Sequence, residues 1–171
     1  MALTQVASGL IASVSGASLT GTQNIPKATL PTGSVLQVVS ASYGTTVRNS
    51  TSTYIDTGLT ATITPTSATS KILVNVCQAD PYKSAGNSNS AVNIRLVRNS
   101  TEIIIVGLAN CYTGTSIQSN GPSISTTFLD SPATTSATTY KTQFANYTNA
   151  AEVGVQSSNG VSTITLMEIS A

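Results

Sequence analysis

The sequence predicts an all-β protein, a jelly-roll β-sandwich of about eight to ten strands preceded by an extended N-terminal arm. Three observations lead to this fold class. Hydrophobic and polar residues alternate over most of residues 32–171, which is the two-residue period of strands with one buried face. Clusters of turn residues separate the alternating segments at intervals typical of a sandwich. No segment after residue 31 has the periodicity of a helix.

The first 31 residues differ in composition from the rest of the chain. They are rich in Ala, Ser, Thr and Gly and contain one charged residue, Lys27. Their hydrophobic residues are spaced like one face of a short amphipathic helix, although Gly9 and the many hydroxyl residues disfavour a helix; these residues are Leu3, Val6, Leu10 and Val14. Such a segment cannot form a core alone. We interpret residues 1–31 as a docking arm and residues 32–171 as a head; the alternative is a frayed terminus.

The clearest strand pattern lies between Tyr54 and Cys77. Hydrophobic residues alternate with threonines before Pro65–Ser70, and a second alternation follows it. Proline fixes φ and small polar residues make local turn hydrogen bonds, so this segment interrupts the strands. We predict two neighbouring strands of a β-meander whose buried residues are Leu59, Ala61, Ile63, Ile72, Val74 and Val76.

Strands are also expected elsewhere in the head. They are centred on Val35–Tyr43, Val92–Leu96, Ile103–Leu108, Ile124–Phe128, Tyr140–Phe144 and Ile164–Ile169. Phe128, Tyr140 and Phe144 fall on alternating positions and are expected to form an aromatic cluster in the core. Asn159-Gly160 is a strong signal for a two-residue type I′ hairpin turn.

Two segments indicate a subunit interface. Ile103–Leu108 is hydrophobic on both alternating faces, so one face would contact the core and the other a partner. Which face does which is left open. The last strand is also largely hydrophobic. We therefore predict an interface that contains Ile103, Ile104, Ile105, Val106, Leu166, Met167 and Ile169.

The low charge content restricts the class of protein. Charged residues make up 8% of the chain, against roughly a quarter in an average protein, and the net charge is +1. A net charge near zero gives little protection against self-association, as suits a protein inside an assembly. There is no basic patch for nucleic acid. The longest hydrophobic run, Ile103–Ala109, is much shorter than a membrane span requires, so no membrane partner is expected.

The sequence predicts no catalytic, cofactor-binding or metal-binding residues. Histidine is absent, and no glycine-rich nucleotide loop or nucleophile motif is present. A paired-carboxylate hydrolase and a calcium site near Asp80 and Asn87 stay open as alternatives. So does a disulfide between the two cysteines, which we otherwise expect to be small buried residues; they are Cys77 and Cys111. Tyr82 and Tyr112 lie in expected loops, where a ring can stack on a sugar or anchor an interface.

Four sequence segments resemble a pattern found in structural proteins of tailed bacteriophages, many of them marine or cyanobacterial. These segments are GSVLQVVS (33–40), DTGLTATITP (56–65), TSATSKILVNV (66–76) and STITLMEI (162–169). The resemblance implies a small trimeric jelly-roll head, similar in kind to the globular heads of the complement and tumour-necrosis-factor families. It also implies a place in a virion assembled in the bacterial cytoplasm, and it brings no catalytic residues.

Two functions follow from this resemblance. The first is a non-enzymatic, homotrimeric decoration or cement protein whose arm binds the major capsid protein or another virion protein. The alternative is the head of a tail fibre that binds a host surface glycan or receptor through its loops. The N-terminal segment is short and has no shaft-forming repeat, which favours the capsid. A third possibility, an enzyme, lacks any motif.

Overall fold

The computed structural model describes residues 30–86, 89–148 and 151–171. The chain divides into residues 1–30 and a second unit, Pro31–Ala171. The predicted arm residues lie outside the described residues; they are Leu3, Val6, Leu10 and Val14. The described residues of the second unit contain strands and no helix, so the predicted all-β sandwich is confirmed.

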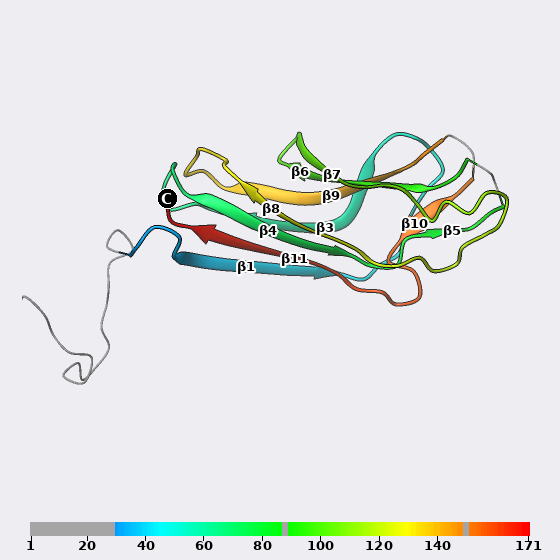
Figure 1. Cartoon of the computed structure of the whole chain (residues 1–171), viewed down its shortest axis with the longest axis horizontal. Coiled ribbons are helices and arrows are strands. Elements are labelled where there is room, and N and C mark those ends of the chain that lie inside the picture. Colours follow the sequence, from blue (N-terminus) through cyan, green and yellow to red (C-terminus); the bar gives the residue numbers. More distant parts are fainter. Residues whose placement is uncertain (1–29, 87–88, 149–150) are drawn as a thin grey trace, which may run out of the picture. The chain divides into compact units, whose positions relative to one another are not determined.

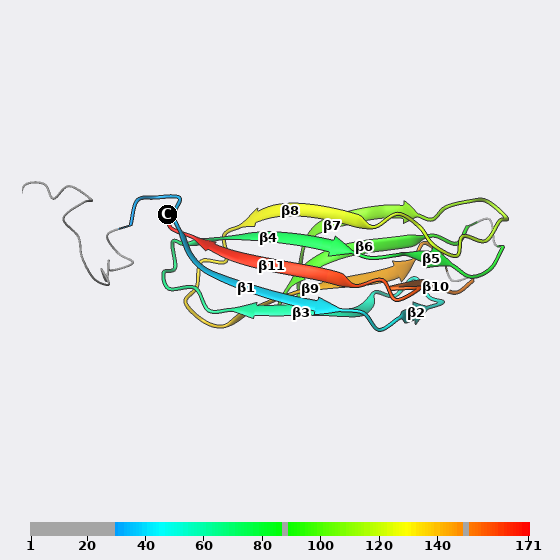
Figure 2. The ribbon, with the colours of Figure 1, turned by 90° about the horizontal axis from the view of Figure 1, so that it is seen from below.

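Eight long strands form two antiparallel sheets packed face to face (Figure 1). Sheet 1 contains, in spatial order, β1 (Val35–Tyr43), β11 (Ser162–Ile169), β4 (Lys71–Gln78) and β8 (Ile124–Asp130). Sheet 2 contains β3 (Ile55–Ile63), β9 (Thr138–Asn146), β6 (Val92–Arg98) and β7 (Thr101–Asn110). Figure 2 shows sheet 1 in front, with its four strands running side by side.

A short third sheet, the end sheet, lies at one end of the sandwich, away from the C-terminus (Figure 1). Its strands are β2 (Val47–Asn49), β10 (Val153–Val155) and β5 (Tyr82–Lys83). Residues 84–86, 89–91 and 111–123 lie in loops beyond the long strands at the same end.

Consecutive long strands often belong to different sheets, as in a jelly roll. β3 pairs with β9 in sheet 2, whereas β4 pairs with β11 and β8 in sheet 1. The predicted β-meander of β3 and β4 is therefore wrong. The buried faces were predicted correctly, since Leu59 and Val74 are almost inaccessible. Alternation reports which face of a strand is buried but not which strand lies beside it, and Pro65–Ser70 leads the chain across the sandwich.

The interior contains two hydrophobic clusters. The larger one includes Tyr140, with Phe128 packed against it, and the smaller one, nearer the end sheet, includes Phe144. The three aromatic residues therefore do not form the single cluster that alternation predicted. Thr142 lies between Tyr140 and Phe144 on β9, and Thr57 holds the corresponding place on β3.

Buried polar side chains separate the two clusters. The Thr57 and Thr142 hydroxyl oxygens are 2.6 Å apart, and Thr142 Oγ1 donates to Gln78 Oε1 at 2.8 Å. Gln78 Nε2 donates to Ser162 Oγ at 2.8 Å, and Gln156 Nε2 donates to the Thr57 carbonyl at 3.2 Å. All five side chains are fully buried. The Thr142–Gln78 bond joins sheet 2 to sheet 1, and because an unpaired buried polar group is unfavourable, it favours one alignment of the two sheets; Gln156 Oε1 is left without a partner among the described residues.

The Asn159-Gly160 segment does not form the predicted hairpin. Asn159 has a φ of +67°, as a primed turn requires, but the strands on either side lie in different sheets. The backbone N–H groups of Gln156 and Ser157 donate to the carbonyl oxygens of Ala79 and Asp80. These bonds hold the segment before the turn against the β4–β5 connection, and after the turn the chain enters sheet 1 as β11.

Candidate functional site

The outer face of sheet 1 has a row of hydrophobic side chains that crosses all four strands. Strand register places Val38 of β1 beside Met167 of β11, Met167 beside Leu73 of β4, and Leu73 beside Leu129 of β8. We call these four residues the apolar row. Val38 is 57% exposed and Leu129 is 48% exposed, and the two between them are partly exposed. A contiguous exposed patch of this kind is typical of an interaction surface.

The rest of this outer face is almost free of charge. Val35 and Ile169 extend the hydrophobic surface beside the apolar row, and Lys71 is the single charged side chain at an outward position of the four strands. Toward the end sheet, the outward residues are small and mostly hydroxylated; they are Ser40, Ser42, Thr163, Thr165, Asn75, Cys77, Thr127 and Ser125. The face therefore offers hydrophobic contact and neutral hydrogen-bonding groups.

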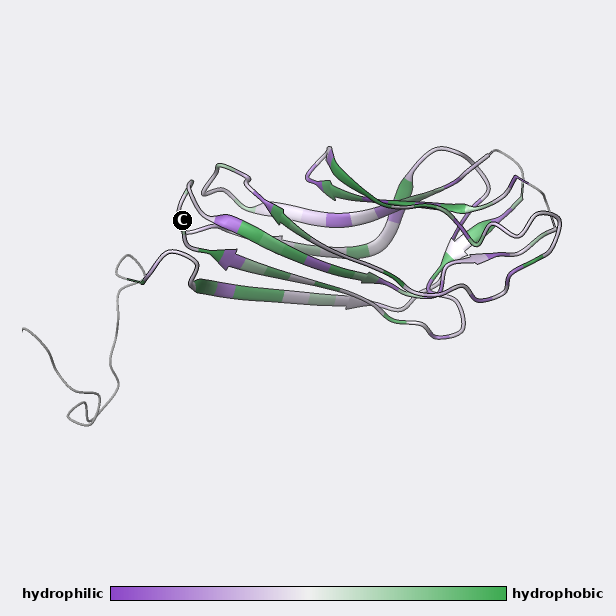
Figure 3. Ribbon diagram, in the orientation of Figure 1, coloured by the Kyte–Doolittle hydropathy of each residue, from purple (hydrophilic) through white to green (hydrophobic). Residues whose placement is uncertain are grey.

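The outer face of sheet 2 has the opposite character. A row that also crosses four strands contains Asp56, Gln143, Arg95 and Ile105. Gln143 Nε2 donates to Asp56 Oδ1 at 2.6 Å, and Arg95 donates to Gln143 Oε1 from Nε at 2.9 Å and Nη2 at 2.7 Å. Figure 3 shows hydrophilic positions along β9 and hydrophobic ones along β1, β4 and β8, and also along the edge strand β7 of sheet 2. Three strands of sheet 2 (β3, β9 and β6) are thus linked by polar groups that satisfy one another, whereas the edge strand β7 exposes Ile105 and Leu108.

Ion pairs complete this polar surface. Lys141 Nζ lies 2.9 Å from Asp56 Oδ2, Arg95 Nη1 lies 2.9 Å from Glu102 Oε2, and the Arg95 guanidinium stacks 4.0 Å from the ring centre of Tyr54. Partial burial alone would raise the pKa of Asp56, but hydrogen bonds from Lys141 and Gln143 outweigh it and hold the pKa below its usual value. These charges already have partners within the chain.

The predicted interface residues divide into three groups. Leu166 points inward and is fully buried in the core, so we remove it from the predicted interface. Met167 belongs to the apolar row, and Ile169 lies next to it. The four isoleucine and valine residues of β7 lie on the edge strand of sheet 2; three pack against the core and Ile105 remains 37% exposed. The predicted partner of β7 stays a prediction.

Sequence reasoning did not identify three members of the apolar row, Val38, Leu73 and Leu129. Each is a hydrophobic residue at an outward position of its own strand, and Leu73 lies between Lys71 and Asn75 in the alternation. A hydrophobic residue at an outward position is a sequence signal of an exposed contact, and it could have been recognised in each strand separately. The alignment of all four residues depends on register between strands far apart in sequence, which one sequence does not provide.

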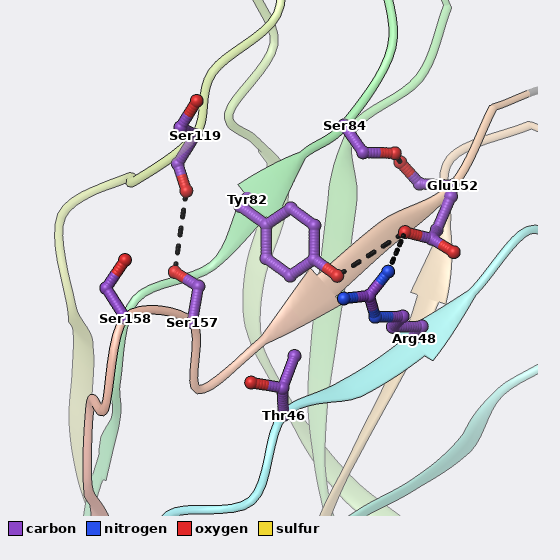
Figure 4. Close-up of a pocket in the computed structure, with 8 residues that line it drawn as sticks. All are labelled: Thr46, Arg48, Tyr82, Ser84, Ser119, Glu152, Ser157 and Ser158. Atoms are coloured by element: carbon purple, nitrogen blue, oxygen red, sulfur yellow. Dashed lines mark hydrogen bonds and ion pairs between the residues drawn. The ribbon is translucent and has the colours of Figure 1, made fainter.

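A second candidate site is an open pocket of about 350 Å³ beside the end sheet (Figure 4). Its lining is polar and consists of Thr46, Arg48, Tyr82, Ser84, Ser119, Glu152, Ser157 and Ser158. Arg48 Nη1 lies 3.2 Å from Glu152 Oε1, and the Tyr82 hydroxyl donates to the same oxygen at 3.5 Å. One positive and one negative charge among hydroxyl groups suit a neutral polyol better than an anion.

The predicted sugar-stacking role of the loop tyrosines is only partly compatible with this geometry. Tyr82 is 7% exposed, and its ring packs so closely on Gly154 that a Cβ there would lie 2.3 Å from Cε1. Burial raises the pKa of its hydroxyl. Tyr82 therefore forms a pocket wall rather than an open stacking surface. Tyr112 is 55% exposed but does not line the pocket.

The described residues also bear on the disulfide and the calcium site that the sequence left open. Cys77 and Cys111 are both free, and burial raises the pKa of the Cys111 thiol to about 11. Across residues 30–86, 89–148 and 151–171, no three Cys, Asp or Glu side chains gather in a way that could hold a metal ion. Asn87, the other member of the suggested calcium site, lies outside these residues. Nor does the described part of the chain contain a helix that could cross a membrane.

Comparison with known proteins gives limited similarity. No protein-family model matches the chain, and no curated protein does. Three structures of infectious bursal disease virus proteins share 11% identity with it: the VP2 subviral particle (TM-score 0.39, 79% of this chain), the Gx strain (0.42, 90%) and the derived T=1 particles (0.40, 90%). The chain spans about two fifths of the length of those proteins, with 38%, 42% and 41% of each covered.

Proposed function

We propose that this chain is a non-enzymatic structural protein of a tailed-phage virion, a decoration or cement protein with a homotrimeric head. The single observation that carries the proposal is the difference between the two outer faces. Sheet 2 has internally paired charges across its strands and hydrophobic exposure at its edge strand β7, whereas sheet 1 exposes a neutral face with the apolar row across all four strands. A large exposed hydrophobic patch stabilises assemblies and is a liability for a protein that remains free in solution.

The resemblance of four segments to phage structural proteins supports the same proposal. Residues 1–31 would bind the major capsid protein or another virion protein, and the particle would be assembled in the bacterial cytoplasm. Purified protein is expected to show no hydrolase turnover. Saturable hydrolysis that is lost on changing Asp56, Asp80 or Asp130 would argue for an enzyme instead.

The copy number in purified virions tests the location. A decoration protein is expected at hundreds of copies over the capsid, and a tail-fibre head at tens of copies on the tail. Quantitative mass spectrometry of purified particles, with gold-labelled antibody to locate the protein, separates these results. Its absence from purified particles would reject a virion role altogether.

Deletion of residues 1–27 tests the arm. The head contains every described strand, so the truncated protein is expected to fold and to remain oligomeric. It should no longer bind particles stripped of the native protein. If it decorates them as well as the full chain does, attachment runs through the head.

The pocket beside the end sheet favours a second candidate function, the head of a tail fibre that binds a host surface glycan. Arg48 and Glu152 are both partly exposed, and each can hydrogen-bond a sugar hydroxyl. Arg48→Ala with Glu152→Ala should abolish adsorption to host cells if this function holds. For a decoration protein, the same double variant should leave adsorption unchanged.

A further inference from the structure

We infer that the outer face of sheet 1 binds the same face of a second copy of this chain, with the apolar row of each copy against that of the other. The inference rests on the proposed structural role and adds a contact to the proposed trimer, because a face that binds its own copy joins copies in pairs about a two-fold axis. The apolar row spans the full width of the sheet, since its members are successive register partners. A two-fold axis between two such faces would place one row directly on the other.

Charge favours a copy over a different partner. A charged partner needs complementary charge, and the outward positions of sheet 1 provide only Lys71, at the end of β4. A second copy of the chain would place its own neutral apolar row against this one, and no charge would be left without a partner in that contact. The net charge of +1 adds little repulsion between copies.

The hydroxyl-rich part of the face is compatible with this partner. Ser40, Thr165, Asn75 and Thr127 form the next outward row toward the end sheet. Thr127 Oγ1 donates to Asn75 Oδ1 at 2.5 Å, so part of this row is already paired. Small hydroxyl groups can pair across the interface or through water, and they leave no unpartnered charge when they are covered.

The area of the outer face of sheet 1 indicates how strongly two copies should associate. Four strands spaced about 4.8 Å apart, each of about eight residues rising about 3.3 Å, cover roughly 500 Å². Two copies would bury roughly 1,000 Å², the lower limit of specific protein interfaces. We therefore expect association that depends on protein concentration and that a single charge in the apolar row disrupts.

The test is the mass of the purified full chain over a dilution series, by light scattering without virus particles. Wild-type protein should be oligomeric when concentrated and monomeric when dilute. Leu73→Asp, at the centre of the apolar row, should weaken association at least a hundredfold. Ile105→Asp is the matched control, because it places the same charge on an outward hydrophobic residue of sheet 2.

Three outcomes would overturn the inference: a wild-type chain that is monomeric at every concentration, a Leu73→Asp variant that associates like wild type, or dissociation by Ile105→Asp alone, which would move the interface to β7. Leu73→Asn is a milder second variant, and a circular-dichroism melt separates dissociation from unfolding. Because no particles are involved, an oligomer in solution with no protein in virions would reject the proposed function and leave this interface standing.

Discussion

The two rows that cross the outer faces of the sandwich have the same geometry and opposite chemistry. On sheet 2, Asp56, Gln143 and Arg95 hydrogen-bond to one another across three strands. On sheet 1, the apolar row occupies equivalent outward positions with no polar group. Both rows belong to one chain of low charge, so composition alone does not explain the difference. Four charged side chains lie on the outer face of sheet 2 (Asp56, Arg95, Glu102 and Lys141), whereas Lys71 is the single one on that of sheet 1. This difference is the basis of the proposal that a second copy covers sheet 1.

The largest expected effect comes from placing charge on the neutral face. Leu129→Lys changes a 48% exposed residue of the apolar row, so the fold should tolerate it. Burying the new ammonium group between two copies is unfavourable by several kcal/mol, and association should weaken at least about tenfold. Sedimentation equilibrium measures this. Thr62→Lys on sheet 2 is the control and should associate like wild type; equal weakening by both variants would remove the distinction between the faces.

Acid should affect stability without affecting association. Burial alone would raise the pKa of Glu168, but hydrogen bonds from Thr66 and Gln37 outweigh it and keep the pKa below its usual value. A lowered folded-state pKa stabilises the protein above the unfolded pKa of about 4.3, and this stability is lost as the pH falls through the folded value. The apolar row contains no titratable group.

Glu168→Gln tests this pH dependence. The variant should lose about 1–2 kcal/mol at neutral pH, where charged hydrogen bonds are replaced by neutral ones. Its denaturant-unfolding curve should approach that of wild type below pH 4. The association constant of wild type should be constant between pH 5 and 8. A pH-dependent association constant would mean that a titrating group belongs to the interface.

A smaller effect is expected from the centre of the polar surface. Arg95→Met removes the hydrogen bonds to Gln143, the ion pair with Glu102 and the contact with the Tyr54 ring. Partly exposed ion pairs and cation–π contacts each contribute about 1 kcal/mol or less, so unfolding should become easier by roughly 1–1.5 kcal/mol. The oligomer mass should not change. Dissociation of the variant would show that the polar face also binds a copy.

Salt should produce the smallest effects. It should lower the stability contributed by the ion pairs of sheet 2 and should not weaken association through sheet 1. Raising the ionic strength from about 0.1 to 1 M screens the partly exposed pairs of sheet 2 and should cost a few tenths of a kcal/mol in stability. Hydrophobic association through sheet 1 should stay equal or strengthen in a kosmotropic salt. Sedimentation in sodium sulfate measures it, and weaker association there would indicate an electrostatic interface.

The sequence was enough to predict which face of each strand is buried. It was not enough to predict which strands pair or in which sheet each strand lies. Alternation correctly placed Leu59 and Val74 in the interior, because burial repeats every second residue. It did not reveal that β3 and β4 lie in different sheets, or that Asn159-Gly160 joins two sheets. The pairings that define both outer faces join residues up to 134 apart, as between Val35 and Ile169. Leu166 was assigned to an interface because hydrophobicity alone does not distinguish a core residue from one on a contact surface.

The rate at which a thiol reagent modifies Cys77 reports directly whether a second copy covers the outer face of sheet 1. This thiol is on the outer face of sheet 1, between Thr163 and Ser125, and it is partly exposed in a single chain. Cys111 is buried and has a pKa raised to about 11, so it should stay protonated and unreactive. We predict slow modification of Cys77 in concentrated wild-type protein and fast modification in the dissociated Leu73→Asp variant. Equal rates in the two proteins would contradict the claim that a second copy covers this face.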